Sequence, residues 1–135
     1  MKKIFLLATV LVALLCTASC GDNSFQAEVT ETNTYLQIDA EQAKQIMDSE
    51  TNYVIIDART QEEYDGGHIK GAVLIPEYEI AERAENELPD KNQLILVYCR
   101  SGRRSKIAAQ ALADLGYTNV KEFGGIIDWE YETVK

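Results

Sequence analysis

Short apolar runs alternate with amphipathic segments from residue 35 to the end of the chain. Runs of strand length occur at residues 35–38, 53–57, 72–75, 94–98 and 119–123. Helical patterns cover residues 40–49, 60–64, 79–87 and 105–115, and a last short helix carries Trp129. Buried strands that alternate with helices are typical of a parallel sheet covered on both faces. The pattern therefore predicts one α/β domain with a central, mostly parallel sheet.

Capping residues indicate where two of these helices begin and end. Asp39 precedes the first helix, and Gln42 follows three positions later, which is the spacing of a capping box. Ser105 is expected to cap the helix over residues 105–115 with its hydroxyl, and Gly116 is expected to end that helix. The apolar face of this helix is expected at Ile107, Ala108, Ala111, Leu112 and Leu115.

The first residues have the pattern of an export signal. Lys2 and Lys3 precede an apolar run over residues 4–15, which is shorter than the roughly 20 residues that a spanning helix needs. Small residues and then Cys20 follow, an arrangement that resembles the lipobox of bacterial lipoproteins, although Thr17 stands where that box has leucine. The alternatives are a secretory signal cut near Ser19 and an uncleaved anchor.

This resemblance divides the chain into three parts. Residues 1–19 are expected to be a lipoprotein-type signal peptide, residues 20–34 a flexible tether, and residues 35–135 the folded domain. Lipidation of Cys20 would place the protein in the bacterial cell envelope, anchored to a membrane through that lipid alone, on the periplasmic or extracellular face.

The net charge and the number of cysteines narrow the range of possible functions. The formal net charge of −9 opposes binding to nucleic acid and to anionic membranes. Of the three cysteines, Cys16 would leave with the signal and Cys20 would carry lipid, so Cys99 would be the only thiol. A lone cysteine in an exported protein is either an inert buried residue or a reactive thiol.

The segment around Cys99 favours the reactive alternative. Residues 98–106 hold four of the 13 basic residues and no acid, between an apolar strand and a helix. A helix N-terminus and nearby cations favour a thiolate over a thiol. Gly102 allows a tight bend of the backbone. The residues expected to bind an anionic substrate beside Cys99 are Arg100, Ser101, Gly102, Arg103, Arg104 and Ser105.

Three motifs in this order resemble those of the rhodanese family. They are Cys99-Arg100-Ser101-Gly102-Arg103-Arg104-Ser105 after a strand, the segment from Asp57-Ala58-Arg59 to Gly67-His68-Ile69-Lys70-Gly71-Ala72, and Gly124-Gly125 with Trp129. The resemblance implies a five-stranded sheet with helices on both faces, and a Cys99 persulfide that carries sulfane sulfur. It implies a small anionic donor such as thiosulfate, a thiol or cyanide-like acceptor, and no cofactor or metal.

Three further residues are expected to support this site. Asp57 and Arg59 follow a central strand, and we interpret them as an ion pair that fixes the neighbouring loop, because buried charges need partners. The alternative is that Arg59 adds positive potential at the sulfur. His68 is the only histidine; we interpret it as a structural turn residue rather than a general base or a metal ligand.

Two alternative functions stay open, and a third, phosphatase activity, is disfavoured. Cysteine phosphatases of related fold need arginine six positions after the cysteine, where this chain has Ser105. A non-enzymatic sulfur-carrier or protein-binding module stays open. A thiol redox protein stays open only through pairing between molecules, because no second cysteine remains to resolve a disulfide.

Overall fold

The central element of the fold is a five-stranded parallel sheet. The computed structural model describes residues 33–135. The sheet has the strand order β1-β6-β5-β2-β4, and every pairing in it is parallel. Its strands are β1 (Leu36–Gln37), β2 (Tyr53–Asp57), β4 (Ala72–Leu74), β5 (Leu94–Cys99) and β6 (Val120–Gly125). The expected parallel α/β architecture is therefore confirmed.

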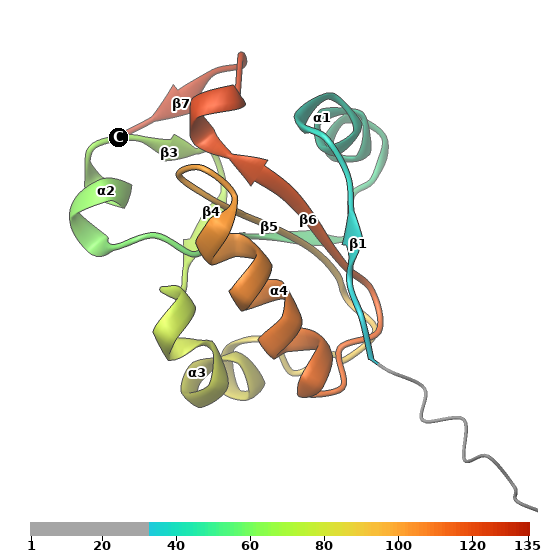
Figure 1. Cartoon of the computed structure of the whole chain (residues 1–135). Helices are drawn as coiled ribbons and strands as arrows, with labels where there is room; N and C mark the ends of the chain where they lie inside the picture. The colour runs from blue at the N-terminus through green and yellow to red at the C-terminus, as the bar shows by residue number, and fades with distance from the viewer. Residues whose placement is uncertain (1–32) are drawn as a thin grey trace, which may run out of the picture. The chain divides into compact units, whose positions relative to one another are not determined.

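Helices cover both faces of this sheet. The α-helices are α1 (Ala40–Ser49), α2 (Gln61–Asp65), α3 (Ile80–Glu87) and α4 (Arg103–Asp114), with short 3₁₀ turns η1 (Glu77–Glu79) and η2 (Ile126–Asp128). Helices α3 and α4 pack on one face, and α1 lies on the other (Figure 1). Parallel strands need such crossover connections. Because helices cover both faces of the sheet, both faces are buried and carry apolar side chains.

Each face of the sheet has its own hydrophobic core. The core beneath α3 and α4 contains Ile56, Val97 and Leu112, none of which is exposed to solvent. The core beneath α1 contains Leu96 and the aromatic ring of Phe123. Neighbouring residues of a strand point to opposite faces, and so β5 contributes alternately to the two cores. Cys99 belongs to the core beneath α3 and α4.

Helix α1 begins with the capping box that its sequence predicts. The Asp39 side chain accepts a hydrogen bond from the Gln42 backbone N–H at 2.7 Å, and the Gln42 side chain accepts one from the Asp39 backbone N–H at 3.1 Å. These reciprocal bonds satisfy two backbone donors that the first turn leaves without partners. The predicted capping box and the predicted range of α1 are both confirmed.

Helix α4 begins earlier than the sequence indicates. Its first residue is Arg103, and the N-cap is Gly102, whose φ of 97° lies in the left-handed region. Ser105 therefore lies inside the first turn, and the prediction that it caps the helix is wrong. The predicted apolar face is confirmed at Ala108 and Leu112, which are buried in the core, and at Ala111 and Leu115, which pack against it. It is wrong at Ile107, which is 48% exposed, and the structure adds the buried Ala109 and Ala113 to this face.

A second, two-stranded sheet was not predicted. It pairs β3 (His68–Ile69) antiparallel with β7 (Thr133–Val134). Two-residue strands have too few positions for an alternating pattern, and so the sequence carries no signal for them. The pairing ties the end of the chain to the segment that follows α2 (Figure 1).

The predicted signal peptide, the predicted lipidation site at Cys20 and most of the predicted tether lie outside the described residues. Within residues 33–135, no helix combines the length and apolarity needed to span a bilayer.

Candidate active site

Three chain segments meet where Cys99 ends β5. Asp57 ends the neighbouring strand β2, and Gly125 ends β6 on the other side. Carboxyl ends of parallel strands lie at one edge of a sheet, which is the usual place for a ligand in open α/β folds. Residues 100–102 connect Cys99 directly to α4, so that the cysteine loop is held between a strand and a helix N-terminus.

The sulfur of Cys99 is buried but has polar partners. Its residue is 1% exposed. The Gly102 backbone N–H donates to Sγ at 3.0 Å, and the Ser105 Oγ lies 3.4 Å from it. A sulfur in this position is neither solvated nor surrounded by aliphatic groups alone. The loop therefore holds the sulfur by hydrogen bonds, as a site for a thiolate requires.

These hydrogen bonds determine the ionisation of the thiol. Burial raises the pKa of Cys99, because a charged sulfur loses its hydration. Hydrogen bonding with the Ser105 hydroxyl, together with hydrogen bonds from the backbone amides of Ser105, Gly102 and Ser101, outweighs burial, and the net pKa of the Cys99 thiol lies below its ordinary value. The local geometry thus favours the nucleophilic form of the cysteine.

The three arginines of the loop differ in their exposure and in their hydrogen-bond partners. Arg100 and Arg103 are exposed. Arg104 donates two hydrogen bonds to Glu63, at 2.7 and 2.8 Å. Among residues 33–135, the sulfur makes hydrogen bonds with Gly102 and Ser105 but with none of these guanidinium groups. For Arg104 the interaction with the sulfur is one of charge, because Cys99 is among the groups that raise the pKa of Arg104, after its hydrogen bonding to Glu63.

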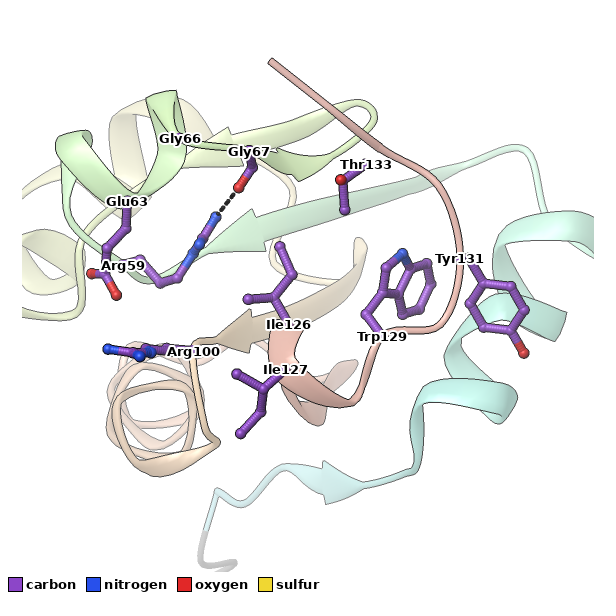
Figure 2. Close-up of a pocket in the computed structure, with 10 residues that line it drawn as sticks. All are labelled: Arg59, Glu63, Gly66, Gly67, Arg100, Ile126, Ile127, Trp129, Tyr131 and Thr133. Carbon is purple, nitrogen blue, oxygen red and sulfur yellow. Dashed lines mark hydrogen bonds between the residues drawn. The ribbon is translucent and has the colours of Figure 1, made fainter.

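A cleft opens beside the cysteine loop (Figure 2). Its volume is about 500 Å³, far more than a thiosulfate ion would fill. Arg100 contributes to one wall, Glu63 and Gly67 of the α2 region to another, and Ile127 and Trp129 to the third. The cleft thus combines a cation with apolar surface, although Trp129 itself is only 9% exposed.

Asp57 and Arg59 form the expected ion pair. The Arg59 guanidinium donates to Asp57 at 2.6 to 3.1 Å and to the Gly67 carbonyl oxygen at 2.8 Å. Both side chains are almost fully buried. Burial lowers the pKa of Arg59, but hydrogen bonding and charge from Asp57 raise it above its ordinary value. The pair fixes the loop that follows α2, which is the first of the two roles predicted for it.

His68 belongs to the same loop. Its Nδ1 lies 2.9 Å from the Tyr64 carbonyl oxygen, and its ring stacks on the Tyr64 ring with 3.6 Å between centroids. Within residues 33–135, no three side chains of metal-ligating type are grouped as a metal site would require. These contacts are those of a structural residue that shapes the turn before β3.

Tyr98 completes the buried network around Asp57. Its hydroxyl donates to Asp57 Oδ2 at 2.5 Å and accepts from the Ile69 N–H at 3.1 Å. We expect Tyr98→Phe to lower the free energy of unfolding by about 1–3 kcal/mol, since two buried groups lose a partner. Urea denaturation measures the change, and Tyr78→Phe, at a ring that is 69% exposed, is the matched control. Equal stability of the two variants would contradict this role.

The pair of Glu63 and Arg104 makes stability depend on pH. Hydrogen bonding to Arg104 lowers the pKa of Glu63 from 4.5 to about 2, against the opposing effect of burial and with help from Thr60. A carboxyl with a lowered pKa in the folded state stabilises the fold above its ordinary pKa and loses that contribution as the pH falls through its folded pKa.

We therefore expect wild type to be more stable than Glu63→Gln above about pH 4.5, and the difference to shrink as the pH falls towards about 2. Urea denaturation over a pH series measures this difference. Glu82→Gln, at an exposed acid of α3, is the control for the loss of one negative charge. A Glu63→Gln difference that stays constant with pH would refute the assignment.

One buried acid at this site is absent from the residues that the sequence predicts there. Glu122 in β6 is 2% exposed, and its Oε1 accepts hydrogen bonds from Ser105 Oγ at 2.6 Å and from the Gly124 N–H at 2.8 Å. The alternation along β6 was the available signal, because Val120 and Glu122 share a face of the strand and Val120 belongs to the core.

The fold and the loop together define a class of protein: an α/β domain with a cysteine held by amides at the carboxyl edge of a parallel sheet. Residues 39–132 match the rhodanese-like domain family. The chain therefore belongs to the rhodanese-like domain family.

Individual relatives agree with this membership. The thiosulfate sulfurtransferase PspE of Escherichia coli is 42% identical over 80 residues, which are 59% of this chain and 77% of that protein. A sulfurtransferase of Allochromatium vinosum is 36% identical over 94 residues, 69% of this chain and 86% of that protein. A rhodanese structure with anions from E. coli superposes with a TM-score of 0.58 at 41% identity, covering 62% of this chain and 98% of that chain.

Proposed function

We propose that this protein is a sulfurtransferase that moves sulfane sulfur from a thiosulfate- or persulfide-type donor to a thiophilic acceptor through a persulfide on Cys99. The observation that carries the proposal is the sulfur of Cys99, which receives a backbone N–H at 3.0 Å and has a thiol pKa below its ordinary value. The names of two relatives, a thiosulfate sulfurtransferase and a sulfurtransferase, support the same reaction class.

In the first half-reaction, the Cys99 thiolate attacks the outer sulfur of thiosulfate. A bond forms between Sγ and that sulfur, the bond inside thiosulfate breaks, and sulfite leaves with the electron pair. The product on the enzyme is a persulfide anion, so that charge balances. In the second half-reaction, a thiolate or cyanide attacks the outer sulfur and restores the Cys99 thiolate.

The loop supports both half-reactions by electrostatics. Charge moves from Sγ to the outer sulfur as the persulfide forms. The Gly102 amide donates to Sγ at 3.0 Å, and the amides of Ser101 and Ser105 also lower the pKa of the thiol. Donors fixed before the reaction stabilise such charge without reorganisation. Arg100 at the cleft and the exposed Arg103 attract an anionic donor in an otherwise acidic protein.

A steady-state assay with several donors tests this function. With thiosulfate as donor and cyanide as acceptor, we expect catalytic formation of thiocyanate by the purified protein, and a phosphate ester such as p-nitrophenyl phosphate to give no turnover. The absence of thiocyanate with thiosulfate and with alternative sulfane donors would overturn the enzymatic proposal and leave the carrier or binding module. Turnover of the phosphate ester would instead indicate phosphatase chemistry.

We also propose that the protein is exported and carries lipid on Cys20. The basic start, the apolar run over residues 4–15 and the small residues before Cys20 support this location. Expression in a bacterial host with a labelled fatty acid tests it, with Cys20→Ser as the matched variant. We expect label in wild type alone. Equal label in both proteins, or none in wild type, would contradict lipidation at this residue.

A further inference from the structure

Glu122 is a buried acid to which the proposed reaction assigns no role. It lies on β6 with 2% of its surface exposed, and its Oε1 is close to Gly102 of the cysteine loop. Its Oε1 accepts the hydroxyl of Ser105 and the backbone N–H of Gly124. A buried carboxylate is costly unless other groups compensate its charge, and these two donors are both neutral. Its place beside a reactive sulfur therefore needs an explanation.

Ser105 connects this acid to the sulfur. The residue is completely buried, and its Oγ lies 2.6 Å from Glu122 Oε1 and 3.4 Å from Cys99 Sγ. A hydroxyl has one proton to donate and lone pairs that accept, and the short contact to a charged acceptor is the stronger bond. Ser105 thus donates to Glu122 and accepts from the Cys99 thiol. Two hydrogen bonds run in series from sulfur to carboxylate.

Neither end of this chain of hydrogen bonds is open to water. Cys99 is 1% exposed and Glu122 is 2% exposed. Ionising both would place two negative charges close together in a region of low dielectric, where like charges oppose each other's ionisation. The site therefore accommodates one negative charge far more readily than two.

Among residues 33–135, no charged side chain donates a hydrogen bond to Cys99 or to Glu122. Glu63 is paired with Arg104, and Asp57 is paired with Arg59. The charges of Glu77 and Cys99 both contribute to the raised pKa of Arg104, after its pairing with Glu63. Within residues 100–106, the cations outside these pairs are Arg100, Arg103 and Lys106, all exposed.

We propose that Cys99 and Glu122 share one proton through the hydroxyl of Ser105. To form the thiolate, the S–H bond breaks and its proton goes to Ser105 Oγ, while the original Ser105 proton goes to the Glu122 carboxylate. The products are a thiolate that accepts a hydrogen bond from Ser105 and a neutral Glu122 carboxylic acid. One proton leaves the sulfur, one arrives at the carboxylate, and the net charge of the site does not change.

This relay supplies the nucleophile of the proposed sulfurtransferase, and so it rests on that function. Glu122 remains protonated while the thiolate attacks the donor and while Cys99 carries the persulfide anion. Reprotonation of sulfur runs along the same path in reverse. Ser105 touches the reacting sulfur, whereas Glu122 acts through Ser105 and is a positioning residue.

The pH dependence of Cys99 alkylation tests the relay. The full chain is treated with the neutral reagent iodoacetamide over a pH series, and the rate at Cys99 is measured on its peptide by mass spectrometry. Two groups that share a proton titrate as a pair, in two steps. We expect a two-step rise in wild type and a single step in Glu122→Gln, which keeps the hydrogen-bonding oxygen but cannot take the proton. Glu130→Gln, at an exposed acid, should retain the wild-type profile.

A second variant tests the relay if Glu122→Gln fails to fold. In Ser105→Ala the thiolate loses its hydroxyl donor while Glu122 stays charged, and so the rise in Cys99 alkylation should move to higher pH. A Glu122→Gln profile identical to wild type would overturn the proposal and leave Glu122 a structural residue. A Ser105→Ala profile identical to wild type would overturn it as well.

This experiment involves no sulfur transfer. If neither thiosulfate nor another sulfane donor leaves sulfur on Cys99, but the wild-type and Glu122→Gln alkylation profiles differ as described, the proposed function fails and the proton relay stands. If sulfur transfer occurs and the two profiles coincide, the relay fails and the sulfurtransferase stands.

Discussion

Replacing Cys99 with alanine is expected to lower thiosulfate-dependent thiocyanate formation to background, a loss of about 10³-fold or more, as when other enzymes lose their nucleophile. The sulfur atom is the only group at the site that forms a covalent bond in the proposed reaction. The remaining loop amides would still bind an anion, but no atom could receive its sulfur. The steady-state thiosulfate and cyanide assay measures the loss.

Two controls distinguish the loss of the Cys99 nucleophile from a loss of the folded structure or an effect of replacing another cysteine. Alanine at position 99 fills most of the space of the buried thiol, and so thermal unfolding should show a folded variant. Cys20→Ser should keep the activity of wild type, because Cys20 lies in the expected signal and tether region and takes no part in the reaction. Equal rates for Cys99→Ala and wild type would exclude the persulfide mechanism.

Gly125→Ala is expected to reduce the same activity by about 100-fold, through displacement of the cysteine loop. A Cβ at position 125 would lie 2.1 Å from the Arg100 carbonyl oxygen and 2.6 Å from the Ser101 Cα. These are backbone atoms, so the loop itself must move by the order of 1 Å, a displacement that costs catalysis about 10²-fold. The thiocyanate assay and urea denaturation together measure activity and stability.

The matched control for this substitution is Gly66→Ala. Gly66 has φ −70°, and the nearest atom to an added Cβ is the Glu63 carbonyl oxygen at 3.4 Å. Alanine fits there without strain, and activity should stay within about twofold of wild type, in line with a free-energy change of about 0.5 kcal/mol or less. If Gly125→Ala were as active as Gly66→Ala, the tight packing of loop against β6 would have no functional role.

Much of the fold could be predicted because its signals are local. The strand at residues 53–57 and the capping box of Asp39 depend on neighbours a few positions apart. The start of α4 was placed two residues late because Ser105 is a typical capping residue. In the structure a left-handed Gly102 begins the helix instead, and the serine hydroxyl is directed at sulfur and carboxylate.

The residues of the candidate site also fall into two groups: those in a local motif could be predicted, and those brought together by the fold could not. Cys99 and its loop stand out because four cations and one thiol occur within nine residues. Glu63 pairs with Arg104 across 41 positions of sequence, and Glu122 bonds Ser105 across 17. Such contacts depend on how strands β2, β5 and β6 are ordered in the sheet, which no local pattern specifies. No local pattern predicts that Arg104 has a carboxylate partner of its own, and the role of the three arginines towards an anionic substrate stays a prediction.

The account depends most directly on sulfur becoming covalently attached to Cys99. Wild-type protein is incubated with thiosulfate, freed of excess donor, and digested for mass spectrometry of the peptide that contains Cys99. We predict a peptide heavier by one sulfur atom, which returns to its original mass when cyanide or a thiol is added. An unmodified Cys99 peptide, with thiocyanate still produced in the assay, would contradict the persulfide mechanism.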